Sequence, residues 1–489
     1  MNKIGASLLL AGLVSAAAAQ TNTPATRVLS LQDCITEALQ HNFDVRVERY
    51  EPEKSLLDLH AAYAGYDPVL SLSGTHTHND AGGFARTNGV AVTDGNSFNS
   101  GLNGALPWGM TYGLNGNIAD TYGASPESTG GQVGATLTQP LLKDFWIDST
   151  RLSISAAKNT LKYSEQGLRQ QLITTVSAVE TAFYELIYAR ENVKVEEEAL
   201  VLAQTQLNDD NQRVQIKVIA ERGGTIEQDQ AQVAQSRANL IAAQFTLESD
   251  QNALKNLITD DYLQWHDVDI EPATKLEAVR QFFDVQDSWG KGMTARPDLL
   301  QAKLTLEQQG IQLKYDRNQI FPQIDLVGSY GYNGAGNGYS DAFGQYATAN
   351  RPFWSYGGQF SVPLSNAKAR NGYKADKAIE QQYLLKVKQL EQNVMVEIDD
   401  AVKQAQSAWE SVDATKQARI SAEAALNAEQ GKYAAGKSTT FTVLQLQNNL
   451  TAARSQEIRA LANYNEALSN LAQQEGSTLV RRNVDVTVK

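Results

Sequence analysis

Two long stretches of the chain place apolar residues at intervals of three, four or seven. In residues 148–219 these positions are Leu161, Leu168, Leu172, Val176, Val179, Phe183, Leu186, Val193, Leu200 and Leu207. The second stretch repeats the spacing at Val387, Leu390, Val394, Ile398, Val402, Ala405, Trp409 and Val412. This spacing predicts long helices packed as coiled coils. At 1.5 Å per residue the first helix would extend about 108 Å, far more than a globular core requires.

Each long helix is predicted to reverse at a glycine-containing tip, because glycine can end a helix in a left-handed conformation. The first tip consists of Glu221, Arg222, Gly223 and Gly224, and the second runs from Ala434 through Gly436 to Lys437. Two antiparallel helical hairpins result, over residues 148–258 and 365–473. The returning helix of the first hairpin is the shorter one, so we expect residues 30–65 to cover the rest of its long partner.

Between the helices, short segments alternate apolar with small polar residues. Leu70 and Leu72 alternate with Ser71 and Ser73, and the same pattern occurs in residues 132–138, 324–332 and 359–364. Strands with one apolar and one polar face are typical of outer-membrane barrels, although a soluble antiparallel sheet also alternates. Aromatic residues at the strand ends favour a membrane interface. They are Trp108, Tyr112, Phe145, Trp146, Phe353, Trp354 and Tyr356.

The strand regions, residues 66–140 and 321–364, are predicted to hold about four barrel strands per chain. The stretch from residue 99 to 120 could lengthen or split one of them. Four strands cannot close a barrel, and eight would leave an interior filled by side chains. The predicted fold is therefore mixed α and β, a trimeric 12-stranded transmembrane β-barrel continued by a long antiparallel α-helical periplasmic barrel.

The chain contains an internal repeat. Residues 42–74 align with residues 296–328 at one constant offset of 254, which pairs Pro68 with Pro322. The first repeat is assigned to residues 20–258 and the second to residues 296–473. Between the two Pro landmarks of each strand region the first copy carries 31 extra residues, rich in Gly and Asn, which we expect to form a surface loop.

Two further segments lie outside the repeats. Residues 259–295 break the helical pattern and are predicted to sit outside the helices at mid-height. Residues 474–489 form a C-terminal tail. Residues 1–19 have the charge, apolar run and small-residue ending of a signal peptide, so we expect the mature chain to leave the cytoplasm.

The net charge and the sequence motifs do not indicate a nucleic-acid-binding protein, an enzyme or a metal-binding protein. The formal net charge is -13 and the basic residues are scattered, so no nucleic-acid partner is expected. No nucleophile elbow, phosphate loop or metalloprotease helix occurs, and we predict neither an enzyme nor a cofactor. His76 and His78 lie on one face of a strand near Asp80 and could hold a metal, but two histidines at a strand end are a weak signal and no metal site is predicted.

Several short motifs resemble the TolC-like outer-membrane efflux proteins. They are the helix from Leu29 to Leu39 followed by His41-Asn42, then Thr138-Gln139-Pro140-Leu141-Leu142, Arg296-Pro297-Asp298 and Phe321-Pro322. The resemblance implies a homotrimer in the outer membrane of a Gram-negative-type bacterium, in contact with outer-membrane lipid and extending into the periplasm. It implies a passive conduit, closed at its inner end, that serves a tripartite efflux pump or a type I secretion system. A periplasmic adaptor protein and an inner-membrane transporter would dock at the tips.

The resemblance also places a periplasmic constriction in the second tip, from Tyr433 to Gln445. Where some relatives carry aspartates this chain has Thr442 and Gln445, and where some carry an arginine it has Ser438. We therefore predict the gate at the tips, including the first tip, without a charged ring.

A second hypothesis is a periplasmic or surface coiled-coil protein with a structural or adhesive role, in which the strands are only caps. The aromatic belts and the strands anchored by proline argue against it.

Overall fold

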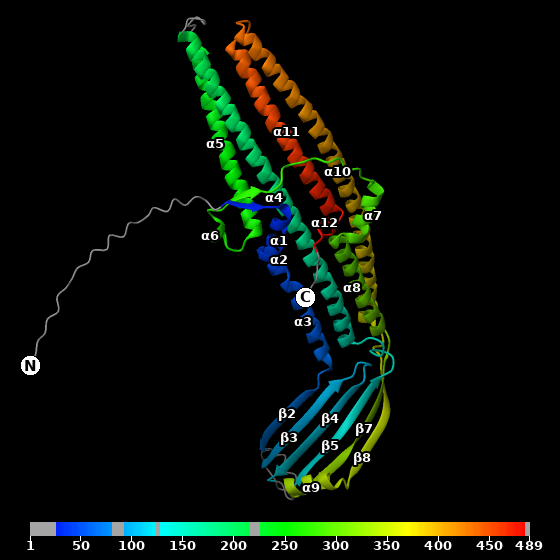
Figure 1. Cartoon of the computed structure of the whole chain (residues 1–489). Coiled ribbons are helices and arrows are strands. Elements are labelled where there is room, and N and C mark those ends of the chain that lie inside the picture. Colours follow the sequence, from blue (N-terminus) through cyan, green and yellow to red (C-terminus); the bar gives the residue numbers. More distant parts are fainter. Residues whose placement is uncertain (1–25, 81–91, 124–127, 216–224, 485–489) are drawn as a thin grey trace, which may run out of the picture.

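The computed structural model describes residues 26–80, 92–123, 128–215 and 225–484. Helices form one end and the middle of an elongated molecule, and a curved sheet forms the other end (Figure 1). The predicted signal peptide, the first tip from Glu221 to Gly224, and residues 485–489 of the predicted tail lie outside the described residues.

The sheet is antiparallel and has six strands in the order β2-β3-β4-β5-β7-β8. Their bounds are Val69–Asp80 for β2, Val92–Ala105 for β3, Thr111–Tyr122 for β4, Ser128–Pro140 for β5, Gln323–Gly336 for β7 and Pro352–Ser361 for β8. The edge strands β2 and β8 each have a partner on one side only, β3 and β7 respectively, among the described strands. Because directions alternate across an even number of strands, β2 and β8 run antiparallel to each other.

The prediction of about four strands per chain was wrong. The prediction that the extra residues of the first repeat form a surface loop was also wrong. The hairpin formed by β3 and β4 spans residues 92–122. Its length of 31 residues equals the number of extra residues in the first repeat. Gly and Asn are depleted in strands generally, so this segment resembles a loop by composition. Here most of them lie on one face, while Phe98, Leu102, Leu114 and Ile118 lie on the other, with cross-strand partners in register.

The register sorts the whole sheet into two faces, because side chains alternate along each strand and paired residues share a face. The polar face carries mainly Ser, Thr, Asn, Gln and Gly, and Asp325 is its one charged residue among the described strands. The opposite, apolar face is largely exposed in the single chain. Its large side chains are Leu70, Leu72, Phe98, Leu102, Leu114, Ile118, Val133, Leu137, Leu326, Tyr330, Trp354, Tyr356 and Phe360.

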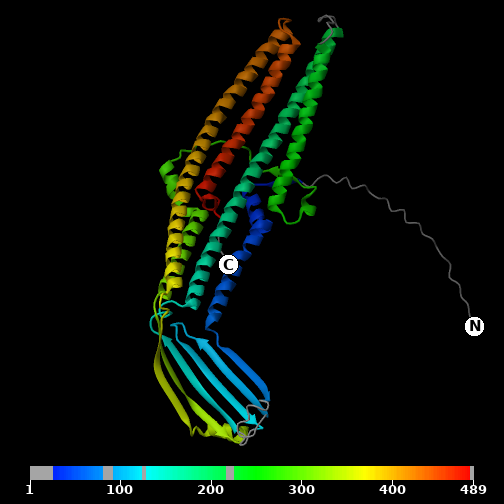
Figure 2. The same cartoon turned by 180° about the vertical axis from the view of Figure 1, so that it is seen from behind.

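Two antiparallel helical hairpins extend away from the sheet. The first consists of α4 (Ser149–Gln215) and α5 (Thr225–Ile258), the second of α10 (Ala367–Ala434) and α11 (Thr440–Gln474). With 67 residues α4 is about 100 Å long. The returning helices accompany only the half that is far from the sheet (Figures 1 and 2).

Shorter helices fill the half nearer the sheet. α1 (Leu31–His41), α2 (Phe43–Glu48) and α3 (Tyr50–Tyr63), followed by the turn η1 (Ala64–Tyr66), pack on α4, as predicted for residues 30–65. α8 (Pro297–Gln319) packs on α10 in the same way. Asn42 separates α1 from α2, where its Oδ1 accepts from the backbone N–H groups of Asp44 and Val45. The asparagine thus caps α2, a local reason for the His41-Asn42 motif.

The remaining elements gather at mid-height. β1 (Thr26–Leu29) pairs in parallel with β6 (Asp269–Pro272), and α6 (Tyr262–Trp265) and α7 (Val285–Ala295) lie on opposite sides of the helical rods (Figure 1). α12 (Thr478–Arg481) leads to Arg482, whose guanidinium forms an ion pair with Glu180, a fully buried residue of α4. Arg296 joins Asp298 to Glu397 on α10, so the Arg-Pro-Asp motif fixes α8 against the second hairpin.

The core runs along the helical seams predicted from the apolar spacing. Burying a side chain such as Phe183 or Leu186 stabilises the fold by roughly 1.5–3 kcal/mol. None of the helices among the described residues combines the length and the hydropathy needed to span a membrane. The largest cluster joins α4 to α1, α2, α5 and β6 through Cys34, Ile35, Ala38, Val45, Leu168, Leu172, Ile173, Val176, Val179, Phe183, Leu186, Ile187, Leu254, Ile258, Ile270 and Leu479.

Candidate functional site

The second tip lies at the end of the molecule most distant from the sheet, between Ala434 of α10 and Thr440 of α11 (Figure 1). Gly436 has a φ of +72°, in the left-handed region. The N–H of Lys437 donates to Lys432 O at 2.9 Å and that of Gly436 to Tyr433 O at 3.0 Å, which is the hydrogen-bond pattern of a Schellman motif. Apart from its chain neighbours, no described residue has an atom within 4 Å of where a Cβ on Gly436 would be, so backbone conformation favours glycine here.

The side chains around this turn stabilise it. Ser438 donates through its hydroxyl to Glu429, which also pairs with Lys432. Both bonds favour the charged carboxylate and hold the pKa of Glu429 below its usual value. Ser438 therefore closes the turn within its own hairpin.

Thr442 and Gln445 lie in the first turns of α11. The N–H of Thr442 donates to the hydroxyl of Thr439, the N-cap residue, at 3.3 Å. Thr442 is half-buried, and Gln445, one helical turn further, is exposed. The two side chains thus lie three residues apart on one side of α11 and are both uncharged.

Asp210 of α4 connects the first hairpin to the second tip. Its carboxylate accepts from Tyr433 Oη at 2.5 Å and from Thr440 Oγ1 at 2.9 Å. A third donor, Gln206 Nε2, lies 3.1 Å away on the same helix. Asp210 is completely buried, and hydrogen bonds to a buried charge are among the stronger ones in proteins.

Tyr433 is the central donor of this cluster. Burial raises its pKa to about 12, and the hydrogen bond to Asp210 acts in the same direction, so the phenol keeps its proton at physiological pH. The guanidinium of Arg213, on α4, lies over the ring at 4.6 Å from its centre. Tyr433 therefore contacts the first hairpin through both its hydroxyl and its ring.

Asp229 of α5 completes the cluster and has an unusual environment. The residue is fully buried, and no described residue donates a hydrogen bond to either of its carboxylate oxygens. Burial, followed by the charge of the neighbouring Asp210, raises the pKa of Asp229 to about 7. We call Asp210, Asp229, Tyr433 and Thr440 the tip cluster.

The sequence analysis named Tyr433 and Gly436 as tip residues but did not single out Asp210, Asp229 or Thr440. A signal was present in the periodicity of α5, where Asp229, Ser236 and Ala243 are buried at intervals of seven residues. An acidic residue on the buried seam of a coiled coil contradicts the apolar pattern, and such local conflicts are expected at functional sites.

The two histidines considered for a metal have other partners. His76 Nδ1 lies 2.9 Å from Asn96 Oδ1, and His78 Nδ1 lies 2.6 Å from Asp94 Oδ1. Among the described residues no group of three or more His, Cys, Asp or Glu side chains is arranged to hold a metal ion.

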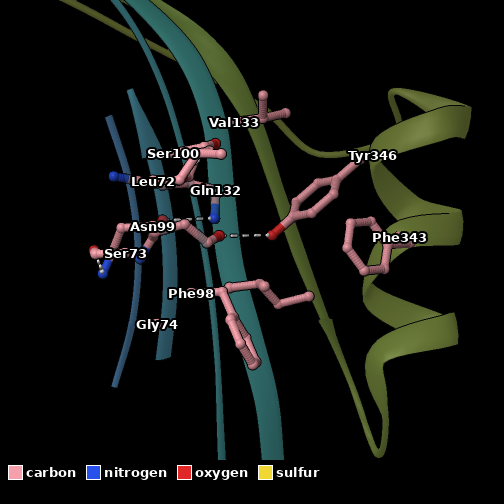
Figure 3. A pocket seen from close by; sticks show the side chains of 13 residues that line it. Leu72, Ser73, Gly74, Phe98, Asn99, Ser100, Gln132, Val133, Phe343 and Tyr346 are labelled. Carbon is pink, nitrogen blue, oxygen red and sulfur yellow. Dashed lines mark hydrogen bonds between the residues drawn. The ribbon is translucent and has the colours of Figure 1, made fainter. Parts of the chain in front are cut away.

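A hollow lies at the sheet, where α9 (Tyr339–Thr348) covers part of the apolar face (Figure 3). Tyr346 Oη donates to Asn117 O at 3.2 Å and holds the helix over β4. The groove between them has a volume of about 600 Å³. Its larger apolar lining residues are Leu72, Phe98, Ile118, Val133, Phe343 and Tyr346.

Comparison with known proteins identifies the fold. Residues 293–477 match the family model for outer membrane efflux proteins. The outer membrane efflux protein BepC of Brucella suis biovar 1 (strain 1330) is 23% identical over 357 residues, which cover 71% of this chain and 73% of BepC.

Several solved structures are similar over almost the whole chain, and two of them serve as examples. The CmeC outer membrane channel of Campylobacter jejuni superposes with a TM-score of 0.69 at 16% identity, over 92% of this chain and 86% of CmeC. The outer membrane protein VceC of Vibrio cholerae has a TM-score of 0.68 at 18% identity, over 91% of this chain and 96% of VceC. The resemblance to TolC-like outer-membrane efflux proteins is confirmed, together with the predicted outer-membrane location and periplasmic extension.

Proposed function

We propose that this chain, a relative of the TolC-like outer-membrane efflux proteins, is one of three identical subunits of a passive export conduit that closes at its helical tips. The observation that carries the proposal is the two-faced open sheet at one end of long helical hairpins. A sheet with one apolar and one polar face is suited to separate lipid from an aqueous lumen.

Closure of the barrel follows from the free edges. β8 of one subunit can pair with β2 of the next in antiparallel fashion, since both edges lack a partner among the described strands. Three six-stranded sheets would give a barrel of eighteen strands rather than the twelve expected from the sequence. Barrel diameter grows roughly in proportion to strand number, so the lumen would be about half as wide again.

The tip cluster supports a closed resting state. Asp210 holds the end of the second hairpin against the first through Tyr433 and Thr440. Two hairpins joined at their free ends cannot separate to widen the passage. An inner-membrane transporter acting through a periplasmic adaptor would supply energy and cargo, as part of a tripartite efflux pump or a type I secretion system. The subunit itself is proposed to carry out no catalysis.

The mass and conductance of the protein test this proposal. Detergent-solubilised protein should have the mass of three chains, fractionate with outer membranes and conduct ions after insertion into a planar bilayer. A monodisperse monomer that conducts ions would refute the trimer. A protein that stays soluble without detergent would favour the alternative, a periplasmic or surface coiled-coil structural or adhesive protein.

A further inference from the structure

We infer that Asp229 and Asp210 share one proton at neutral pH, and that this proton holds the second tip against the first hairpin. The inference rests on the proposed function only for its consequence, the opening of a passage. The shared proton and the contact that it maintains concern these helices alone.

The hydrogen-bond inventory of the tip cluster requires the proton. A carboxylate accepts at about four positions, and Asp210 has donors from Tyr433, Thr440 and Gln206. Asp229 faces Asp210, is fully buried and has no donor for either oxygen among the described residues. Two ionised carboxylates in contact inside a protein repel each other strongly. One proton removes both difficulties, because protonated Asp229 donates to Asp210 and occupies its fourth position.

Within the part of the chain that the structure describes, no cation is paired with Asp229 instead. The titratable group that faces Asp229 is Asp210 on α4, and Asp210 in turn contacts Tyr433 on α10. Arg213 lies over the Tyr433 ring, and Lys432 and Glu429 pair with each other at the turn. Residues 440–453 of α11 contain no ionisable side chain, so this helix contributes only the Thr440 hydroxyl.

The sign of the pH dependence follows from the raised pKa of Asp229. An ordinary Asp has a pKa near 3.9, so between about pH 4 and 7 the closed tip binds a proton that a solvated Asp229 would have lost. The free energy that holds the tips together is therefore greatest below this range and declines as the pH rises towards 7. Above about pH 7 the second carboxylate ionises next to the first, and Asp210 loses a donor and gains a repelling charge.

A measurement of the distance between the two hairpins tests the inference independently of channel conductance. Spin labels attached to Asn208→Cys and Lys437→Cys, both exposed in the single chain, report the separation of α4 from the second tip in the detergent-solubilised full-length protein. The fraction of separated tips should rise about tenfold between pH 6 and pH 8, as a group with a pKa near 7 ionises. With Asp229→Asn the separation should stay small at every pH, because the amide donates to Asp210 and cannot ionise.

Asp316→Asn is the matched control. Asp316, on α8, is a second carboxyl with a raised pKa, about 6, owing to burial and its neighbour Asp376 on α10. It lies far from the tip, so this variant should keep the wild-type pH response of the labels. The inference is overturned if the label separation in wild type does not change with pH, or if it changes with pH in Asp229→Asn as much as in wild type.

Conductance recorded on the same samples separates this inference from the proposed function. Labels that respond to pH as expected in a protein that never conducts would refute the conduit and support the shared proton. Labels that do not respond in a protein that conducts would refute the shared proton and support the conduit.

Discussion

Replacing Tyr433 by Phe tests the contribution of the tip cluster most directly. Tyr433→Phe removes a 2.5 Å hydrogen bond to the buried carboxylate of Asp210 and keeps the aromatic ring under Arg213. A hydrogen bond to a charged group contributes about 1.5–3 kcal/mol. At about 1.4 kcal/mol for each factor of ten, the ratio of closed to open tips should fall roughly tenfold to a hundredfold per subunit.

Single-channel recording in planar bilayers measures this change. Tyr433→Phe should spend far more time in conducting states than wild type at the same voltage and pH. Tyr464→Phe is the matched control, because Tyr464 is also buried and donates to Val279 O at 2.7 Å, but at mid-height on α11. This control should lower thermal stability without altering the open time. If Tyr433→Phe remains as closed as wild type, or if both variants open equally, the tip cluster does not hold the passage shut.

Three further predictions concern the turn, the constriction and the sheet. Gly436→Val forces a β-branched residue to a φ of +72°, at a cost of about 1 kcal/mol or more, and should reduce export in cells more than it reduces insertion of the trimer. Export equal to wild type by a folded variant would show that the turn is not needed. Divalent cations should block the single-channel current of wild type poorly and that of the double variant Thr442→Asp, Gln445→Asp strongly, because converging carboxylates focus a negative potential. The exposed control Thr36→Asp should leave the block unchanged, and an unchanged block in the double variant would place the constriction elsewhere. Deleting residues 92–122 should shrink the barrel diameter to about two thirds and exclude polymers that enter the wild-type lumen; unchanged exclusion would mean that this hairpin does not line the barrel.

The long helices could be predicted from the sequence, because packed helices place apolar residues at regular intervals of three or four. No other structure explains such spacing over about 60 residues. The strands β2, β5, β7 and β8 were predicted for the same reason, with a period of two. Strands β3 and β4 were not, since Gly95, Gly101 and Gly113 occupy positions where a strand normally shows a side chain. Their alternation becomes visible only when the register shows which residues share a face.

The tip cluster could be predicted only in part. Gly436 follows from the need to end a helix, which is a local rule. The contact between Asp210 and Tyr433 joins residues 223 positions apart, and no local pattern specifies which helices meet at the tips. A buried acid such as Asp229 indicates a conflict in the sequence, but its resolution depends on a partner from another helix.

The composition of the polar face has a consequence for permeation. With Asp325 as its one charged residue among the described strands, this wall carries dipoles but almost no fixed charge. A wide pore of this kind produces little Donnan exclusion, so anions and cations should enter the barrel in similar proportion and adsorb weakly on the way out. Permselectivity would then arise before the cargo reaches the barrel, and chemically dissimilar molecules could leave by the same route.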